Sequence, residues 1–587
     1  MPHFQRFPSR RSVVYSKAGM VACTQPLAVE AGQRVLAIGG NAADAAVAAA
    51  AALAVTEPAS TGIGGDMFAL FFDARTRRVH AINGSGRSPR NSTLSRVRGD
   101  LNIPQGMLGR IPMRSAHAVT VPGAAAGWID SVGSFGSNKL SMKNILGPAI
   151  QLCEEGFPVS DISSWLWKDA EDNLKSSHTD NSAVLKYDHS LSQLRAPKPG
   201  EVVFSPELSK TFQILVAEGK EGFYAGPIAE AIVKAVQSGG GYLELSDLTE
   251  HLRTSSEFTT PISGMFRGQR AFKQNMAFPE IWEHAPNGQG IVVLIALSLL
   301  EEFEKAGRIP QFRPEDHNTT PYLHALIESL SIAFADAHRW VSDPSHARVD
   351  ARTLLSKSYL TERAKLFDPT KAGSHSYGRP LFSPIIESCD TVYLAVTDRE
   401  GNAMSMVNSL YGHFGSCIVP TGYGFALQAR GAAFHLGPEN HPNVYQGGKR
   451  PFHTIIPAII TRSQGVRRDL AAVLGVMGGT MQPQGQLQVF MNLEVFMMNA
   501  QEALDAPRFC VDGEGADRVV FLEEGVSASV EEELTKMGHN IQRLGNWNRS
   551  TFGRGQVVKR QFDNLGGMPI YSAGSDPRGD GCAMPSM

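Results

Sequence analysis

The stretch ESCDTVYLAVTDREGNAMSMVNS, residues 387–409, decides the fold of this chain. It holds two apolar runs, residues 391–398 and 403–410, and the turn REGN lies between them. Strand-forming residues on both sides of a glycine-containing turn are typical of a β-hairpin. In that hairpin Thr391 begins the first strand, and Ser409 lies opposite it, late in the partner strand. Thr is also a good strand residue, so its presence there could be purely structural.

Upstream of the hairpin, residues 26–55 predict two helices joined by a Gly-Gly-Asn turn, with Pro26 near the start of the first. The second helix, residues 42–55, is rich in alanine. It is shorter than the roughly 20 apolar residues that cross a membrane, so we expect a packed helix. Residues 61–73, TGIGGDMFALFFD, predict a glycine-rich turn that leads into a buried strand and a further hairpin.

The remaining patterns suit a layered α/β protein. Residues 142–390 have mostly helical periodicity. After the hairpin, residues 455–461 and 470–477 predict two strands, and residues 484–499 and 528–538 predict helices. Helices, then strands, then helices are typical of a layered sandwich. No tandem repeat or long linker divides the chain into separate domains.

Composition excludes several classes of function. The chain has 587 residues, a net charge of −2 and 19% charged residues, which favours neither nucleic acid nor an anionic membrane as a partner. The six cysteines have no C-x-x-C pair, so we expect reduced thiols. The N-terminus lacks the apolar segment of a secretory signal, so we expect a cytoplasmic protein. Without an H-E-x-x-H motif or a Walker-type loop, we expect no metal or other cofactor.

Eight segments, in the same order along the chain, resemble the γ-glutamyltranspeptidase family. The hairpin stretch resembles the segment around the family's processing site, and residues 28–70 resemble its N-terminal signature. The other segments are EEGFPVS (154–160), GGYLELSDL (240–248), GKRPFHTIIPAI (448–459), GVMGGTMQPQ (475–484), EALDAPRF (502–509) and SDPRGDG (575–581). The resemblance extends from about Lys17 to the C-terminus.

This resemblance implies a four-layer αββα sandwich of the N-terminal nucleophile (Ntn) hydrolase type. It also implies that the precursor cuts itself between Asp390 and Thr391, giving a large subunit, residues 1–390, and a small subunit, residues 391–587. The two would form one intertwined heterodimer, with any higher oligomer left open. A free α-amine titrates at about 7.7–8.0, so the new amine of Thr391 can accept the proton of its own hydroxyl. No separate histidine base is then required.

The same resemblance implies two supporting elements. The backbone amides of Gly478 and Gly479 would form the oxyanion hole of acyl transfer, and the Ser409 hydroxyl would support the nucleophile. Alternatively, the two glycines only make a tight turn from a strand into a helix.

The residues that hold a γ-glutamyl group in the family are largely replaced here. The paired aspartates that bind the substrate amine fall on Ala432 and Ala433, and a Ser-Ser pair falls on His453 and Thr454. The family's carboxylate-binding arginine falls near Ser85. An ammonium left unpaired in a partly dry pocket costs several kcal/mol. The sequence therefore disfavours a substrate with a free α-amine.

Arg430 stands where the family often has an uncharged amide, and a guanidinium there suits a substrate carboxylate. The patterns LQ-x-RGA-x-F and KRP-x-HT resemble a subgroup that includes oxamate amidohydrolase. We therefore predict hydrolysis of a small acidic amide, with Arg430, His453, Thr454, Arg87 and Tyr411 as the substrate-binding residues. Alternatively, Arg430 forms a structural ion pair, and His453 is a hydrogen-bonded core residue.

Two other interpretations stay open. The first keeps the fold and chemistry but takes the family's best-known substrate, glutathione, for hydrolysis or γ-glutamyl transfer, and so a role in glutathione metabolism. The second is a catalytically silent member with a binding role. The presence of both the Asp390–Thr391 bond and the Gly478–Gly479 pair argues against the silent interpretation.

Overall fold

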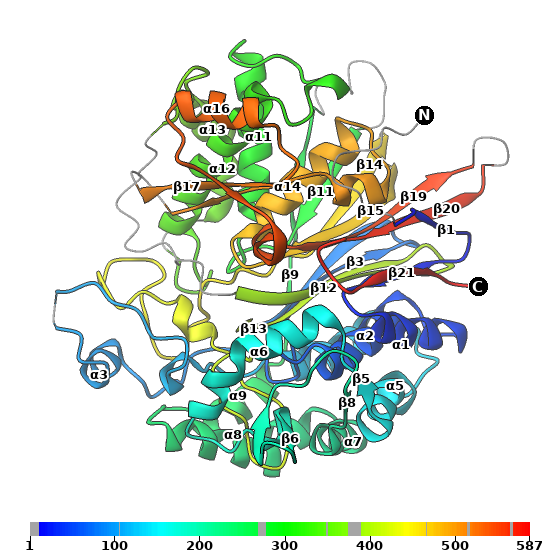
Figure 1. The fold of residues 1–587 in the computed structure, drawn as a ribbon, viewed down its shortest axis with the longest axis vertical. Helices are drawn as coiled ribbons and strands as arrows, with labels where there is room; N and C mark the ends of the chain where they lie inside the picture. Colours follow the sequence, from blue (N-terminus) through cyan, green and yellow to red (C-terminus); the bar gives the residue numbers. More distant parts are fainter. Residues whose placement is uncertain are drawn as a thin grey trace.

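The computed structural model describes residues 11–104, 106–267, 278–347, 350–373, 389–464, 467–513, 517–563 and 567–587. Within them, two seven-stranded antiparallel sheets lie face to face (Figure 1). Sheet I runs in the order β1 (Val14–Ser16), β20 (Pro569–Ser575), β19 (Arg554–Phe562), β15 (Arg467–Met477), β14 (Ala458–Gln464), β11 (Phe278–Glu283) and β10 (Ile262–Met265). Sheet II runs in the order β21 (Cys582–Pro585), β2 (Met20–Cys23), β12 (Cys389–Thr397), β13 (Ala403–Gly412), β3 (Asp66–Asp73), β4 (Arg78–Gly84) and β9 (Glu257–Thr259).

An apolar layer fills the space between the two sheets. Phe68 and Leu70 of β3 meet Ile459 of β14 and Val473 of β15 there. Side chains alternate between the two faces of a strand, so the intervening residues of sheet II face the helices instead. The inner layer therefore holds β12 and its neighbours against sheet I.

Helices cover the outer faces of both sheets. One apolar core joins sheet II to α1 (Pro26–Ala37), α2 (Ala42–Thr56), α4 (Ala124–Phe135), α5 (Met142–Glu155), α6 (Asp161–Ser176), α7 (Pro206–Tyr224), α8 (Pro227–Ser238) and α9 (Leu245–Thr254). A second core joins sheet I to α11 (Ile291–Lys305), α12 (Thr320–Trp340), α13 (Lys357–Ala364), α14 (Met481–Glu494), α15 (Ala500–Asp505) and α16 (Ala528–Lys536). The predicted αββα sandwich is confirmed. No helix of the described residues has both the length and the hydrophobicity that crossing a membrane requires.

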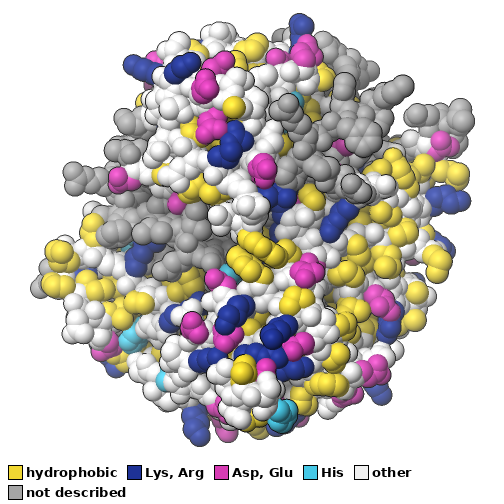
Figure 2. All heavy atoms as spheres, in the orientation of Figure 1, with side chains coloured by type: hydrophobic (Ala, Val, Ile, Leu, Met, Phe, Trp, Pro, Cys, Tyr) yellow, Lys and Arg dark blue, Asp and Glu magenta, His cyan; other side chains and the backbone are white. Residues whose placement is uncertain are grey.

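The smaller elements lie outside these layers. They are α3 (Leu94–Asp100), the strand pairs β5 (Phe157–Pro158) with β8 (Val202–Val203) and β6 (Lys186–Asp188) with β7 (Gln193–Arg195), and the three-stranded sheet of β16 (Phe509–Asp512), β17 (Val519–Glu523) and β18 (Ile541–Leu544). Over α6, basic and acidic side chains are mixed on the surface (Figure 2). Lys168 and Lys175, for example, both bind Glu171.

The helix pair and the buried strand that the sequence predicts for the N-terminal region are confirmed. Pro26 occupies the first turn of α1, and α2 is buried along its whole length. Asn41 caps α2, because its side chain accepts hydrogen bonds from the first amides of the helix. The buried strand predicted after the glycine-rich turn is β3, and the hairpin it begins is completed by β4.

Besides the short pairs β5 with β8 and β6 with β7, three strands of the two main sheets lie within residues 142–390, where the sequence predicts mostly helix. They are β9, β10 and β11. The segment of β11 reads FPEIWE, and proline and glutamate are both depleted in strands. Its strand conformation depends on pairing with β14, which lies far along the chain.

Both sheets combine strands from the two sides of residue 391. In sheet I, β1, β10 and β11 come from residues 1–390, and the other strands follow residue 391. In sheet II, β2 lies between β12 and β21, so an N-terminal strand separates two C-terminal ones. The two predicted subunits would thus share both sheets.

Candidate active site

Thr391 lies at an irregularity in the pairing of β12 with β13. The register shifts between Asp390 and Val392, so two residues of β13 lie opposite Thr391 alone. Such bulges redirect side chains and are frequent beside active sites. Thr391 is 1% exposed, and its Oγ1 lies 3.0 Å from Ser409 Oγ. The side chain of Asp390, which the sequence places before the cleavage point, lies outside the described residues.

The glycine-rich turn before β3 holds the end of β13 in place. Asn408 Nδ2 donates to Thr61 Oγ1 at 2.8 Å and to the Gly62 carbonyl at 3.1 Å. The backbone of Gly65 lies so close that a Cβ there would be 2.5 Å from the Ser409 carbonyl oxygen. Only glycine allows this approach, so the turn fixes the position of Ser409.

Arg430 lies beside Ser409 and is fully buried. It begins a short 3₁₀ helix, Arg430–Ala433. Its Nη1 donates to Thr454 Oγ1 at 3.0 Å, and its Nη2 lies 3.4 Å from Ser409 Oγ. The guanidinium carbon lies 4.5 Å from the centre of the Tyr411 ring, a cation–π contact. We use the name Thr391 cluster for the group formed by Thr391, Ser409, Tyr411, Arg430 and Thr454.

The contacts of Ser409 orient the hydroxyl pair. Its Oγ accepts from the Tyr411 backbone N–H at 2.9 Å and from Arg430 Nη2. A hydroxyl oxygen has two acceptor lone pairs and one hydrogen to donate. Either hydroxyl of the Thr391–Ser409 pair can donate to the other across the 3.0 Å contact. When Ser409 is the donor, it stabilises negative charge that develops on Thr391 Oγ1.

His453 is held by the protein through both ring nitrogens. Its Nδ1 accepts from the Ile455 backbone N–H at 3.3 Å, and its Nε2 lies 3.2 Å from Asp66 Oδ2. Burial lowers the pKa of His453 well below its usual value, so the ring is neutral and Nε2–H donates to Asp66. These are the contacts of a hydrogen-bonded core residue.

Asp66 is a fully buried carboxyl group that pairs in register with Ser409. Its Oδ1 accepts from the backbone N–H groups of Gly86 at 3.2 Å and Gly123 at 3.1 Å. Burial raises the pKa of Asp66 to about 7, although the nearby Arg430 and Arg450 guanidinium groups act in the opposite direction. Asp66 thus joins β3, the Ser409 strand and His453.

Sequence reasoning missed Asp66 and Gln289. The buried Gln289 Nε2 donates to the Thr454 carbonyl at 2.7 Å and to the Gly479 carbonyl at 3.0 Å, and so connects the Thr391 cluster to the glycine pair. A carboxylate between a glycine-rich turn and an apolar run is a signal that could have identified Asp66. Gln289 has no comparable signal, since one amide before a helix is ordinary.

Gly478 and Gly479 form the turn between β15 and α14, with φ angles of 127° and 57°. Both values lie in the region that favours glycine. The carbonyl of Gly478 accepts from the Met481 N–H at 2.9 Å. Neither glycine N–H has an acceptor within the described parts of the chain. The two amides can therefore serve an oxygen of a bound molecule.

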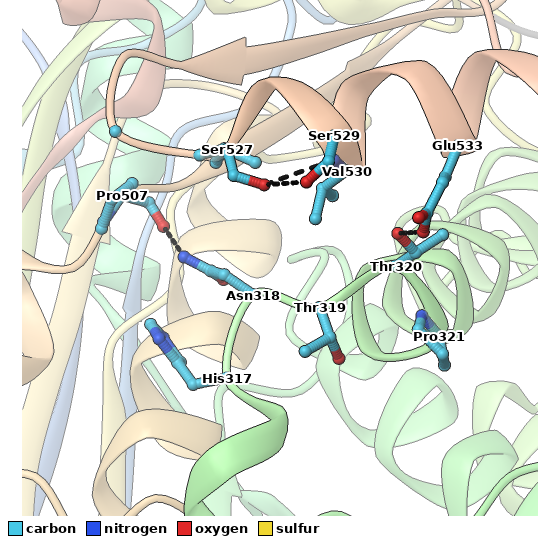
Figure 3. Close-up of a pocket in the computed structure, with 12 residues that line it drawn as sticks. His317, Asn318, Thr319, Thr320, Pro321, Pro507, Ser527, Ser529, Val530 and Glu533 are labelled. Carbon is cyan, nitrogen blue, oxygen red and sulfur yellow. Dashed lines mark hydrogen bonds between the residues drawn. The ribbon is translucent and has the colours of Figure 1, made fainter.

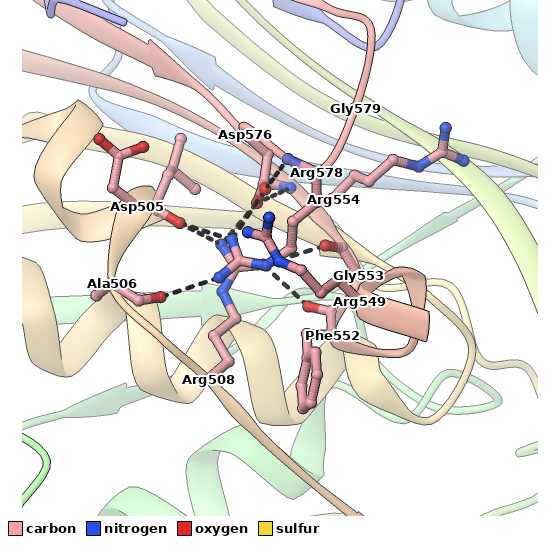
Figure 4. A network of polar contacts seen from close by, with 12 residues as sticks. Asp505, Ala506, Arg508, Arg549, Phe552, Gly553, Arg554, Asp576, Arg578 and Gly579 are labelled. Atoms are coloured by element: carbon pink, nitrogen blue, oxygen red, sulfur yellow. Dashed lines mark hydrogen bonds and ion pairs between the residues drawn. The ribbon is translucent and has the colours of Figure 1, made fainter. Parts of the chain in front are cut away.

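A buried polar network, shown in Figure 4, holds the segment that packs against this turn. Arg508 Nη1 donates to the carbonyls of Phe552 at 2.9 Å and Gly553 at 3.2 Å, and its Nη2 lies 2.6 Å from Asp576 Oδ2. Gly553 in turn packs against Gly478. The segments EALDAPRF and SDPRGDG supply Arg508 and Asp576, so these two motifs act here as structural supports.

Arg87 has a different set of contacts. Its Nη1 binds Asp343 Oδ2 at 3.0 Å and the Gly448 carbonyl at 3.4 Å. Asp343 also accepts from the Arg450 N–H at 2.9 Å. Of the predicted substrate-binding residues, the structure brings Arg430, Tyr411 and Thr454 together around Ser409, while Arg87 lies in a separate ion pair.

Two facing sheets between helical layers are the αββα architecture expected for an Ntn hydrolase. A crystal structure of cephalosporin acylase from Bacillus halodurans has this fold, with a TM-score of 0.84, 37% identity, and coverage of 100% of this chain and 99% of the acylase chain. Residues 28–586 match the family model described as gamma-glutamyltranspeptidase. The chain belongs to the γ-glutamyltranspeptidase family and is an enzyme of the Ntn hydrolase type.

Two curated relatives extend over nearly the whole chain. The glutathione hydrolase-like YwrD proenzyme of Bacillus subtilis (strain 168) is 32% identical, covering 98% of this chain and 99% of its own. The oxamate amidohydrolase proenzyme of Klebsiella pneumoniae is 29% identical, covering 97% of this chain and 98% of its own. Both names describe proenzymes.

Proposed function

We propose that this enzyme is a self-processing amide hydrolase whose nucleophile is the Thr391 hydroxyl. The observation that carries the proposal is the 3.0 Å contact between Thr391 Oγ1 and Ser409 Oγ, inside a buried cluster and at the bulge that follows Asp390. Self-processing fits this position, because the hydroxyl lies on the residue directly after the bond to be cut.

Processing begins when Thr391 Oγ1 attacks the carbonyl carbon of Asp390. The peptide bond to the Thr391 nitrogen breaks, the acyl group moves to the oxygen as an ester, and the nitrogen becomes an amine. Water then hydrolyses the ester, which releases the Asp390 carboxylate and restores the Thr391 hydroxyl. The products are residues 1–390 and residues 391–587.

Substrate hydrolysis repeats the attack on an external amide. The Thr391 amine accepts the hydroxyl proton, and Oγ1 forms a bond to the substrate carbonyl carbon. Ser409 donates to Thr391 Oγ1, and the N–H groups of Gly478 and Gly479 hold the oxyanion. The substrate amine leaves with a proton, and water hydrolyses the acyl-enzyme.

For the substrate we propose a small amide with a carboxylate close to the scissile bond. Arg430 would bind this carboxylate, because its buried guanidinium lies next to Ser409 and its fork geometry suits two oxygens. Thr454 and Tyr411 hold the guanidinium, and His453 with Asp66 supports the Thr454 segment. Ala432 and Ala433 supply no charge for a substrate amine. The name of the Klebsiella relative, oxamate amidohydrolase, fits such a substrate.

Glutathione hydrolysis is the second candidate, favoured by the name of the Bacillus subtilis relative. The test therefore compares three substrates of the processed protein: oxamate, glutathione and a cephalosporin. The cephalosporin is included because of the name of the Bacillus halodurans enzyme. Release of ammonia from oxamate with no reaction of glutathione supports the acidic-amide assignment, and the reverse result replaces it with the second candidate.

Intact-mass analysis and N-terminal sequencing test the nucleophile. We expect a fragment that begins Thr-Val-Tyr-Leu, and we expect Thr391→Ala to remain a single uncleaved chain. An uncleaved wild-type chain without activity on any of the three amides would instead support the catalytically silent alternative.

A further inference from the structure

A second polar cluster lies in the helical layer over sheet I, apart from the Thr391 cluster. His324 and Glu328 are one turn apart on α12, and His539 follows α16. One ligand-type atom from each of the three side chains lies within 4.8 Å of the other two. All three residues are at most 3% exposed. We call this group the His324 cluster.

The hydrogen bonds of His324 fix where its lone pair lies. His324 Nε2 lies 2.8 Å from the carbonyl oxygen of Asp368. A carbonyl only accepts, so Nε2 carries the hydrogen and Nδ1 carries the lone pair. His324 Nδ1 lies 2.8 Å from His539 Nε2. The lone pair of His324 thus faces a nitrogen of the second imidazole.

Either a hydrogen atom or a cation can lie between these two nitrogens. If the hydrogen of His539 is on Nε2, an N–H···N hydrogen bond joins the two rings. If that hydrogen is on Nδ1, the lone pairs of both rings point at each other, and a cation between them removes the repulsion. The imidazole N–H to carbonyl contact of His324 is the arrangement that fixes the tautomer of metal-binding histidines. The carboxylate of Glu328 supplies a negatively charged ligand at the same point.

We propose that His324, Glu328 and His539 bind one divalent transition-metal ion, with Zn²⁺ favoured by two imidazoles and a carboxylate. Its role is structural. His324 and Glu328 belong to residues 1–390 and His539 to residues 391–587, so the ion would fasten the two predicted subunits to each other. The assignment rests on the His324 cluster and does not depend on the chemistry of Thr391.

The surroundings of Glu328 set the expected strength of binding. Its Oε2 accepts from the Gly373 N–H at 3.0 Å, and its Oε1 lies 3.0 Å from Arg518 Nη2. Each carboxylate oxygen has a further lone pair for a metal. The Arg518 charge offsets that of the carboxylate, so we expect weaker binding than at a thiolate site, where the ligands themselves neutralise the ion.

A cavity lies near the His324 cluster. A cavity of about 620 Å³ opens between the start of α12 and the start of α16, lined in part by Thr320 and Glu533 (Figure 3). Thr320 is one helical turn before His324.

The test uses the full-length protein, first treated with EDTA, then incubated with ZnCl₂ and desalted. We expect about one Zn²⁺ per chain by mass spectrometry of the metal, and a higher Tm with Zn²⁺ than with EDTA, since an ion that binds only the folded state stabilises it. His324→Gln and His539→Gln should each lose both responses. His189→Gln, at an exposed histidine outside the cluster, is the matched control and should keep them.

Co²⁺ provides a readout that does not depend on the folding of any variant. The wild-type protein with Co²⁺ should show visible absorption bands of a low-symmetry site, and Zn²⁺ should displace them. A wild-type protein that retains no Zn²⁺, or whose Tm is the same in Zn²⁺ and EDTA, overturns the proposal in favour of a simple hydrogen-bonded pair. Equal Zn²⁺ retention by the two cluster variants overturns it as well, because the ion would then lie elsewhere.

Discussion

Replacement of Arg430 with methionine tests the substrate assignment most directly. Methionine fills a similar volume and removes the guanidinium, which donates to Thr454 Oγ1 at 3.0 Å and lies 3.4 Å from Ser409 Oγ. In the substrate complex we expect the same donors to bind a carboxylate. The substitution therefore removes charge-assisted hydrogen bonds to the substrate.

The size of the effect follows from the number of bonds lost. A hydrogen bond to a charged group contributes about 1.5–3 kcal/mol, and about 1.4 kcal/mol corresponds to a factor of ten. Loss of one or two such bonds at the lower value should raise KM for oxamate by about 10-fold to 100-fold. Arg430→Lys keeps the charge without the fork geometry and should give an intermediate KM.

The assay is steady-state release of ammonia from oxamate, with processing followed in parallel on denaturing gels. Arg363→Met is the matched control, because Arg363 is also a buried arginine, and its guanidinium binds Asp336 between two helices of the outer layer. It should lower stability and leave KM unchanged. If Arg430→Met is processed normally and keeps the wild-type KM, the substrate carboxylate does not bind Arg430.

Two further substitutions test the buried supports. Ser409→Ala removes the hydroxyl that hydrogen-bonds to Thr391 Oγ1 and should slow both processing and hydrolysis by about 10-fold to 150-fold, whereas Ser409→Thr should restore most of the rate in a gel time course. Asp66→Asn tests the carboxyl whose pKa burial raises to about 7. The native state holds this proton more tightly than the unfolded chain, so wild-type stability relative to Asp66→Asn should fall as pH rises from about 4 to about 7, by roughly 4 kcal/mol in all. Urea denaturation at several pH values measures this difference, and parallel curves for the two proteins would show that Asp66 titrates normally.

Local sequence patterns predicted the parts of the fold that depend on neighbours in the chain. Pro26 and the alanine run of α2 predict the helix pair, and the apolar runs on both sides of REGN predict the hairpin of β12 and β13. The opposed positions of Thr391 and Ser409 follow from that hairpin alone. The short strands β10 and β11 were not predicted, because their pairing partners, rather than their own residues, make them strands.

The inner contacts of the site depend on residues that are far apart in the sequence. His453 meets Asp66 across 387 residues, and Gln289 reaches Gly479 across 190. No periodicity or spacing carries such information. The family resemblance pointed to His453 and Thr454 as a pair, but the structure separates their contacts: Thr454 binds Arg430, and His453 binds Asp66. Only the fold distinguishes a side chain that faces a substrate from one that supports its neighbour.

The strand order also predicts that cleavage leaves the two products joined. Hydrogen-bonded ladders connect β2 to β12 and β21, β3 to β13, and β11 to β14, and each crosses from residues 1–390 to residues 391–587. Hydrolysis of one peptide bond beside Thr391 breaks none of these ladders and exposes little of the apolar layer between the sheets. We therefore expect processed protein to elute on size exclusion at the volume of uncleaved Thr391→Ala, and to separate into two chains only in denaturant. Separate elution of the fragments in native buffer would contradict the shared sheets.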